Sequence, residues 1–225
     1  MKLRTFLAEL VGTGFLAASI VGSGVMATNL TKDVGLQLLI VAVATVFMLA
    51  TMIQMLGPIS GSHFNPAVTI GYYVTGHITK IQVLYYLIAE IIGAILGSLF
   101  VLTFIGEKAN LGANAPNYDF SIFLIFPVEV LASMMLMGVI FYVVYTKGLR
   151  GFSGVAIGGI VALDILFLAF ISGASMNPAR ALAPALLSGT FGDLWLYWTA
   201  PFIGTLIAAF LFRGKFRAQR AQIRK

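Results

Sequence analysis

Two nine-residue stretches, ISGSHFNPA at residues 59–67 and ISGASMNPA at residues 171–179, decide how this chain folds. They share six of nine residues, and their asparagines lie 112 positions apart. Asn caps helix N-termini well, because its side-chain oxygen accepts an otherwise unpaired amide of the first turn. Pro fits the first helical position, where the N–H that it lacks would have no intrahelical partner. Each stretch therefore predicts an irregular segment that ends at Asn65 or Asn177 and is followed by a helix.

The sequence around both stretches is strongly apolar. The 225-residue chain is 60% hydrophobic and 10% charged, whereas a soluble domain carries about a quarter charged residues. This composition predicts an integral membrane protein with a single transmembrane domain, residues 1–225. Within a bilayer, irregular backbone is tolerated only where it is buried in protein or lines a water-filled cavity. The doubled stretch therefore indicates a pore.

Six stretches are long enough to cross about 30 Å of hydrocarbon at 1.5 Å per residue. They are residues 5–27, 34–56, 81–105, 122–146, 154–172 and 194–212. The first is interpreted as a span and not as a signal peptide, because it continues without a clear cleavage site. Gly57-Pro58 is expected to end the second span. The helices that start at the two Asn-Pro-Ala triplets, residues 66–74 and 178–187, are too short to cross and are expected to be half-helices.

The second half of the chain repeats the pattern of the first, with repeats at about 5–105 and 122–212. Each half has an acid in its first span, Glu9 or Glu129. Three spans per half is an odd number, so the halves are expected to be inverted, with half-helices entering from opposite faces. The predicted fold class is an all-α membrane protein with six transmembrane helices and two re-entrant half-helices in an inverted repeat.

Basic residues are distributed unevenly over the predicted connections. With the N-terminus in the cytoplasm, eleven Lys and Arg residues fall on the inside and only Lys32 and Lys108 on the outside. Loops rich in Lys and Arg stay in the cytoplasm, so both termini are expected there. The basic tail, residues 213–225, is expected to lie against anionic lipid and not to bind nucleic acid.

The doubled triplet has a direct chemical consequence. Two helix N-termini that meet place two positive dipole ends, each about half an elementary charge, at one point. The amides of Asn65 and Asn177 can donate hydrogen bonds into a narrow channel there. A water molecule must then accept from both, which interrupts a proton-conducting chain of waters, and the positive ends repel cations. The device suits neutral solutes that accept hydrogen bonds.

These features resemble the aquaporins, the major intrinsic protein family, over essentially the whole chain. The resemblance is carried by Asn65-Pro66-Ala67, Asn177-Pro178-Ala179, Arg180 directly after the second triplet, and the acids Glu9 and Glu129. The stretch ISGASMNPARALAPAL, residues 171–186, is similar to the nodulin-like intrinsic proteins and their bacterial relatives.

The resemblance implies a passive channel and not an enzyme, a homotetramer with one pore per subunit, and no cofactor or metal. It implies that Glu9 and Glu129 buttress the motif loops by accepting backbone N–H groups, which agrees with the need of a carboxylate in a span for buried donors. A bacterial inner membrane is the expected location.

The resemblance also implies a constriction beside the asparagine pair, whose positions follow by counting from the motifs. Arg180 is its cation, Ala174 its loop position, Ile165 its fifth-span position and Thr45 its second-span position. Strict water channels usually place a bulky aromatic residue and a His there. With Thr, Ile and Ala instead, the constriction is expected to be wider and less polar. We therefore expect passage of glycerol, urea or undissociated metalloid acids such as arsenite, with a strict water channel as the alternative.

Three residues beside the asparagines are expected to form the pore wall: His63, Phe64 and Met176. For His63, hydrogen bonds to loop carbonyls are an equal alternative. Asp164 is an acid in the middle of a span and is therefore a functional candidate, either as a buttress or as a pore-lining group. If it lines the pore, an ion-coupled secondary transporter is the second function to consider. A membrane enzyme has no support, because the chain has no cysteine and no acid pair at a predicted site.

Overall fold

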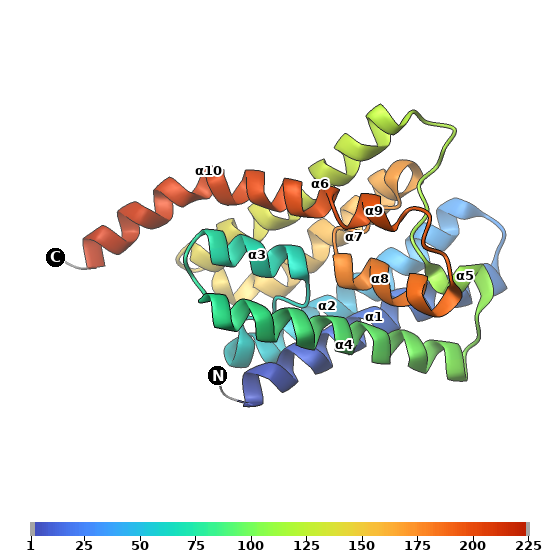
Figure 1. Cartoon of the computed structure of the whole chain (residues 1–225), viewed down its shortest axis with the longest axis horizontal. Helices are drawn as coiled ribbons and strands as arrows, with labels where there is room; N and C mark the ends of the chain where they lie inside the picture. Colours follow the sequence, from blue (N-terminus) through green and yellow to red (C-terminus); the bar gives the residue numbers. More distant parts are fainter. Residues whose placement is uncertain (1–2, 224–225) are drawn as a thin grey trace.

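The structure is a computed structural model and describes residues 3–223 of the chain. Within that range all regular elements are helices. In chain order they are α1 (Leu3–Leu30), α2 (Val34–Ser60), α3 (Pro66–Val74), α4 (Lys80–Phe104), α5 (Lys108–Gly112), α6 (Ile122–Tyr145), the 3₁₀ turn η1 (Arg150–Phe152), α7 (Ser153–Ser172), α8 (Pro178–Ser188), α9 (Leu194–Tyr197) and α10 (Ala200–Ile223). Figure 1 shows their arrangement, with both ends of the chain on the same side of the bundle.

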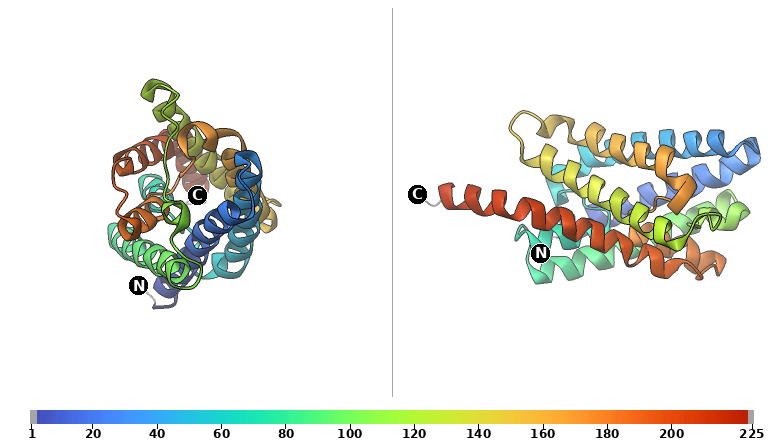
Figure 2. Two further views of the ribbon diagram at one scale, coloured as in Figure 1. Left: turned by 90° about the vertical axis from the view of Figure 1, so that its right-hand side faces the viewer. Right: turned by 90° about the horizontal axis from the view of Figure 1, so that it is seen from above.

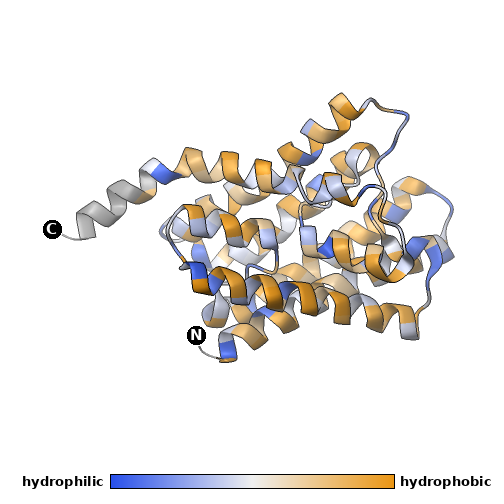
Figure 3. Cartoon of the chain, viewed as in Figure 1, coloured by the Kyte–Doolittle hydropathy of each residue, from blue (hydrophilic) through white to orange (hydrophobic). Residues whose placement is uncertain are grey.

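Six segments of the described chain are long and apolar enough to cross a membrane: α1, α2, α4, α6, η1 with α7, and α9 with the first part of α10. Their axes lie roughly along one common direction through the bundle (Figure 2, right). Hydrophilic residues gather in the connections and at helix ends, while the long helices are mostly hydrophobic (Figure 3). The protein is therefore an integral membrane protein with the predicted fold class.

The two half-helices start as the motifs predict. Asn65 and Asn177 have extended backbone conformations, and each caps the helix that follows with its side-chain oxygen. In each helix Pro occupies the first turn, where its missing N–H leaves no bond unmade. The half-helix α3 packs against α4 and α10, and α8 packs against α4 and α5.

One predicted boundary is wrong, the end of the second span at Gly57-Pro58, and the predicted last span has a break inside it. The helix α2 continues through Gly57-Pro58 and ends at Gly61, whose φ of 90° is left-handed and whose N–H bonds the oxygen of Gly57. Because Pro58 lies in the last turn, left-handed Gly61 ends the helix and Pro58 does not. The last span is interrupted between α9 and α10, where Pro201 follows Ala200 at the start of α10. Proline fits a first turn but disfavours helical continuation from the residue before it.

The helix α10 also extends beyond the predicted end of its span. It continues through most of the predicted basic tail to Ile223 (Figure 1). Residues 224–225 of that tail lie outside the described residues. The last apolar segment, Leu194–Gly214, still includes Arg213 and Gly214, so the tail prolongs the last span as a helix.

Glycines let the first and third spans of each half cross closely. A Cβ atom on Gly97 of α4 would lie 2.1 Å from the backbone oxygen of Gly14 in α1. In the second half, a Cβ on Gly204 of α10 would lie 2.1 Å from the oxygen of Val130 in α6. Small residues allow such backbone contact between membrane helices. These crossings hold α1 and α6, which carry Glu9 and Glu129, close to the motif loops.

Candidate functional site

The two motifs meet through reciprocal hydrogen bonds. The amide nitrogen Nδ2 of Asn65 donates to the backbone oxygen of Met176 at 2.8 Å, and Nδ2 of Asn177 donates to the oxygen of Phe64 at 2.8 Å. The oxygen of each Asn accepts the N–H of Ala67 or Ala179 in its own half-helix. Each amide has two N–H donors, so one donor per Asn is spent on the opposite loop and the other is left for the pore.

Two buried carboxyl groups hold the motif loops from behind. Glu9 in α1 accepts the backbone N–H groups of His63 and Phe64, at 3.1 and 2.7 Å. Glu129 in α6 accepts those of Ser175 and Met176, at 3.2 and 2.7 Å. Both carboxyl groups are fully buried. These are the contacts that a buttress requires, since backbone with positive φ at Phe64 and Met176 cannot satisfy these amides within a helix.

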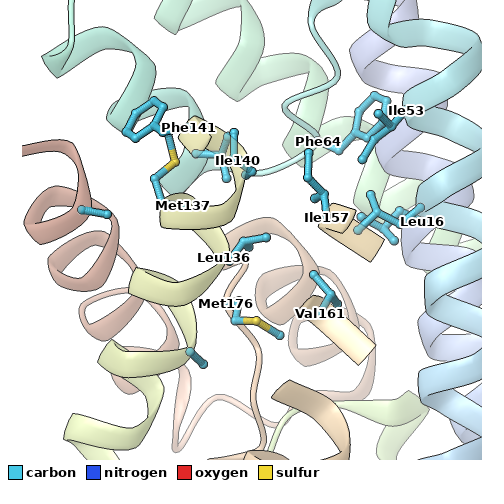
Figure 4. Packing of buried hydrophobic residues seen from close by; sticks show 14 of the residues in the cluster. Leu16, Ile53, Phe64, Leu136, Met137, Ile140, Phe141, Ile157, Val161 and Met176 are labelled. Carbon is cyan, nitrogen blue, oxygen red and sulfur yellow. The ribbon is translucent and has the colours of Figure 1, made fainter. Parts of the chain in front are cut away.

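A cavity of about 510 Å³ lies between the motifs and the face that carries the chain termini. The pore-wall candidates His63, Phe64 and Met176 line it, as do Asn65 and Asn177. The triplet residues Pro66, Ala67, Pro178 and Ala179 do not line it and are buried at the starts of their half-helices. Figure 4 shows Phe64 and Met176 among aliphatic side chains from α1, α2, α6 and α7. The walls of this larger cavity are thus mostly apolar, with polar groups contributed by the motifs and by residues outside them such as Gln54 and Arg150.

A smaller cavity of about 140 Å³ lies on the other side of the motifs. Arg180, Ile165 and Ala174, three of the four residues expected at a constriction, line it together. Apart from Ser175 and Met176 of the second motif, its remaining walls are aliphatic or glycine and include Leu38 and Val41 of α2. The two cavities are adjacent, because both are lined by the same four residues: Ile20, Val161, Ser175 and Met176.

The structure does not bring Thr45 to the constriction with the other three. Thr45 is buried, its hydroxyl has no hydrogen-bond partner among the described residues, and it lines the larger cavity. Val41, about one helical turn earlier, lines the smaller cavity instead. The position of α2 along its own axis is set by its packing on α7, where Gly158 contacts the backbone of Val46. Counting along the chain from Asn65 cannot supply that register.

The sequence nevertheless contains a signal for Val41. The residues of α2 that line the two cavities include Val41, Thr45, Leu49 and Ile53, which are spaced by four. Residues at this spacing lie on one face of a helix. A search for such a stripe would have included Val41 beside Thr45.

A neutral amide holds the guanidinium group of Arg180. The side-chain oxygen of Asn114 accepts from Nη1 of Arg180, and the amide nitrogen of Asn114 donates to the oxygen of Gly173 at 3.1 Å. Among the described residues, no carboxylate hydrogen-bonds to Arg180. Its positive charge therefore remains uncompensated by a direct partner, beside the smaller cavity. Asn114 was not among the residues expected from the sequence, because nothing in the loop links it to the second motif.

The loop that carries Asn114 is fixed to the second half of the chain. The N–H of Asn117 donates to the oxygen of Ile171 at 3.0 Å, next to the second motif. The hydroxyl of Tyr118 donates to the carboxylate of Asp193, at the start of α9. This hydrogen bond raises the pKa of Tyr118 above its ordinary value, because loss of the proton would remove the bond.

Asp164 lines neither cavity. Its side chain is 1% exposed, and its oxygen Oδ2 is buried without a hydrogen-bond partner among the described residues. It neighbours Ile165 in sequence, but adjacent residues on a helix point about 100° apart. The geometry places Asp164 behind the wall of the pore and gives no support to a pore-lining role.

Comparisons with known proteins agree with this geometry. The sequence profile of the family described as major intrinsic protein matches residues 1–212. The chain is 35% identical to a probable aquaporin TIP2-2 of Arabidopsis thaliana, an alignment that covers 96% of this chain and 88% of the relative. It is 32% identical to aquaporin Z of Rhodopseudomonas palustris, over 95% of this chain and 93% of the relative. A probable aquaporin NIP7-1 of Arabidopsis thaliana is 34% identical, with 94% and 76% covered.

A solved structure has the same fold. The X-ray structure of the aquaglyceroporin from Plasmodium falciparum superimposes with a TM-score of 0.75 and covers 94% of this chain and 95% of that chain. The two sequences are 24% identical, so this comparison concerns the architecture of the helices.

Proposed function

The chain belongs to the major intrinsic protein family, whose members are membrane channels and not enzymes, and we propose that it passes water and small neutral solutes such as glycerol, urea and undissociated arsenite. Transport is passive and follows the solute gradient. Protons and ions are excluded at the two half-helix N-termini and at Arg180.

The observation that carries the solute range is the aliphatic lining of the smaller cavity. Besides Arg180, the smaller cavity is lined by Ile165, Val41 and Ala174. Their side chains offer neither hydrogen bonds nor an aromatic ring. A hydrated ion would lose its water shell there without replacement, at a high cost. A neutral polyol or metalloid acid loses less, because its carbon or metalloid framework contacts apolar walls while one of its oxygens accepts from Arg180.

Exclusion of charge is supported by the polar groups that remain. The guanidinium group of Arg180 has a neutral partner, and the dipoles of α3 and α8 point their positive ends to the asparagine pair. Cations therefore meet positive potential at two successive points. Water accepts hydrogen bonds from both Asn65 and Asn177, so the orientation of its hydrogens reverses between them and proton transfer is interrupted.

Solute-by-solute flux into proteoliposomes tests the proposal. Stopped-flow light scattering with the purified protein is expected to show uptake of water, glycerol and urea, and arsenite uptake is measured chemically. Replacement Ile165→Phe puts a larger side chain into the smaller cavity and narrows it, and we expect it to lower glycerol and arsenite flux about tenfold or more while water flux falls less. Ile165→Leu, which conserves volume, is the matched control. Fast water flux with no uptake of the other solutes by the unmodified protein would leave a strict water channel.

We also propose, from the family resemblance, a homotetramer with one pore in each subunit and both termini in the cytoplasm. The excess of Lys and Arg on the face of the termini supports this orientation by the positive-inside rule. The relatives come from plants and from a bacterium, so the expected bacterial inner membrane stays a prediction.

A further inference from the structure

The ring of His63 is fixed in place by two tyrosines. It stacks on Tyr72 with a centroid distance of 4.4 Å and an interplanar angle of 5°. It also contacts the ring of Tyr86, with a centroid distance of 4.6 Å. Tyr86 is held in turn, since its hydroxyl donates to the oxygen of Ser60 at 2.5 Å. The side chain of His63 is 7% exposed. Its ring therefore presents one defined edge to the larger cavity.

Two hydrogen bonds link this ring to a buried acid. The hydroxyl of Thr69 donates to Oε1 of Glu90 at 2.6 Å, and Nδ1 of His63 lies 2.9 Å from the same hydroxyl oxygen. Thr69 and Glu90 have no exposed surface. The second oxygen of Glu90, Oε2, is buried without a hydrogen-bond partner among the described residues. The chain of bonds thus starts at the cavity wall and ends inside the protein.

The number of hydrogens available to the hydrogen-bonded series His63–Thr69–Glu90 decides the tautomer of the histidine. A hydroxyl has one hydrogen to donate, and with Glu90 as a carboxylate, which can only accept, Thr69 gives it to Glu90. Towards His63 the oxygen of Thr69 can therefore only accept, so Nδ1 must carry the hydrogen. The bond that Nδ1 makes to Thr69 thus decides which nitrogen is protonated, and in the neutral ring it leaves Nε2 without a hydrogen.

The other nitrogen, Nε2, faces the larger cavity. It has no hydrogen-bond partner among the described residues, and it is not one of the buried atoms left without one, so it remains open to the cavity that His63 lines. In a neutral ring with a hydrogen on Nδ1, Nε2 is an acceptor. Asn65 and Asn177 line the same cavity with their amide donors.

We propose that Glu90 and Thr69 are positioning residues that hold His63 in its Nδ1–H form, so that Nε2 accepts a hydrogen bond from solute in the larger cavity. The inference rests on the proposed passage of solute and specifies its chemistry. The favoured solutes both donate and accept hydrogen bonds, as water, polyols and urea do. The device exists in one half of the chain, because Ala181 occupies the position after Asn177 that Thr69 occupies after Asn65.

Nitrogen-15 NMR of the full-length protein, labelled at histidine and reconstituted in lipid, reads this form directly. The chain has only two histidines, and a His77→Gln variant identifies the signals of His63. At neutral pH we expect a protonated Nδ1 and an unprotonated Nε2. A hydrogen on Nε2, or on both nitrogens, in the unmodified protein would overturn the inference.

Two substitutions of Thr69 test the positioning role. Thr69→Val removes the hydroxyl at nearly constant volume, and Thr69→Ser keeps it as the matched control. We expect Val to move the hydrogen of His63 towards Nε2 and to lower glycerol and urea permeability about threefold, the effect of one hydrogen bond, while Ser changes neither. An unchanged tautomer in Thr69→Val would contradict the role of Thr69. The tautomer of the unmodified protein is readable whether or not glycerol passes, so failure of the proposed solute range would leave this test intact.

Discussion

Asn114 is the residue on which the charge of the smaller cavity depends. It holds Arg180 by a neutral amide, so this hydrogen-bond partner does not cancel the charge of the guanidinium group. Replacement Asn114→Asp would place a carboxylate against Arg180 and cancel that charge locally. We expect proton and cation leak to rise about tenfold, which corresponds to ~1.4 kcal/mol, while glycerol flux is retained.

Proton leak is measured with a pH-sensitive dye enclosed in proteoliposomes. Asn117→Asp is the matched control, because it adds the same charge to the same loop at a side chain that bonds its own loop at Asp119 and not Arg180. Equal leak in both variants would mean that the added charge acts at a distance. The hydrogen bond of Asn114 to Arg180 would then not control the leak.

Glu129 is expected to show how much the motif loop depends on a carboxylate. Gln offers one acceptor oxygen in place of two, so Glu129→Gln leaves the amide of Ser175 or Met176 unpaired. One unpaired buried N–H costs about 1–3 kcal/mol. The midpoint of thermal unfolding should fall by about 2–4 °C for each kcal/mol in a chain of this size, and solute flux should fall with it.

The unfolding midpoint of the purified protein in detergent checks this expectation. Glu107→Gln makes the same chemical change at an exposed loop residue and should leave the midpoint unaltered. If Glu129→Gln matched that control, the loop would be held by its other contacts.

At the scale of elements, the glycine crossings determine how close α1 lies to α4 and α6 to α10. A Cβ on Gly97 would lie 2.1 Å from a backbone oxygen, whereas one on Gly138 of α6 would have no atom within 4 Å. Gly97→Ala therefore forces the helices apart, at a cost of about 1–3 kcal/mol. Gly138→Ala should be neutral or slightly stabilising, since Ala favours a helix over Gly by roughly 0.5–1 kcal/mol.

Thermal unfolding and solute flux of the two alanine variants check this difference. Because the crossing of α1 on α4 positions Glu9, we expect Gly97→Ala to reduce flux as well as stability. Two variants with the same unfolding midpoint would show that the helices can separate without cost.

For the whole molecule, the arrangement predicts transport without coupling to an ion gradient. The one acid in the middle of α7, Asp164, is 1% exposed and lines neither cavity, and Asn65 and Asn177 do not titrate. Glycerol flux into proteoliposomes should be the same, within about twofold, with and without an imposed proton gradient, and Asp164→Asn should not change that result. A gradient-dependent flux that is lost in Asp164→Asn would favour a secondary transporter.

Much of this architecture follows from the sequence by itself. Helix caps at Asn65 and Asn177, a first-turn proline and long apolar runs act through neighbours in the chain, so they determine the half-helices and the spans without knowledge of the fold. The sequence also places Glu9 and Glu129 in corresponding spans. Local signals are less reliable at Pro58 and Pro201, where the same residue type lies inside the last turn of one helix and at the start of another.

The tertiary structure alone decides which distant groups meet. The bonds of Asn65 to Met176 and of Asn177 to Phe64 join residues more than a hundred positions apart, and Asn114 reaches Arg180 across 66 positions. The register of α2 on α7 places Val41 beside Arg180 and Thr45 in the larger cavity. The His63–Thr69–Glu90 chain likewise needs α3 to lie against α4. Such contacts depend on how whole helices pack, and packing is a property of all the interlocking surfaces together and not of any one stretch of sequence.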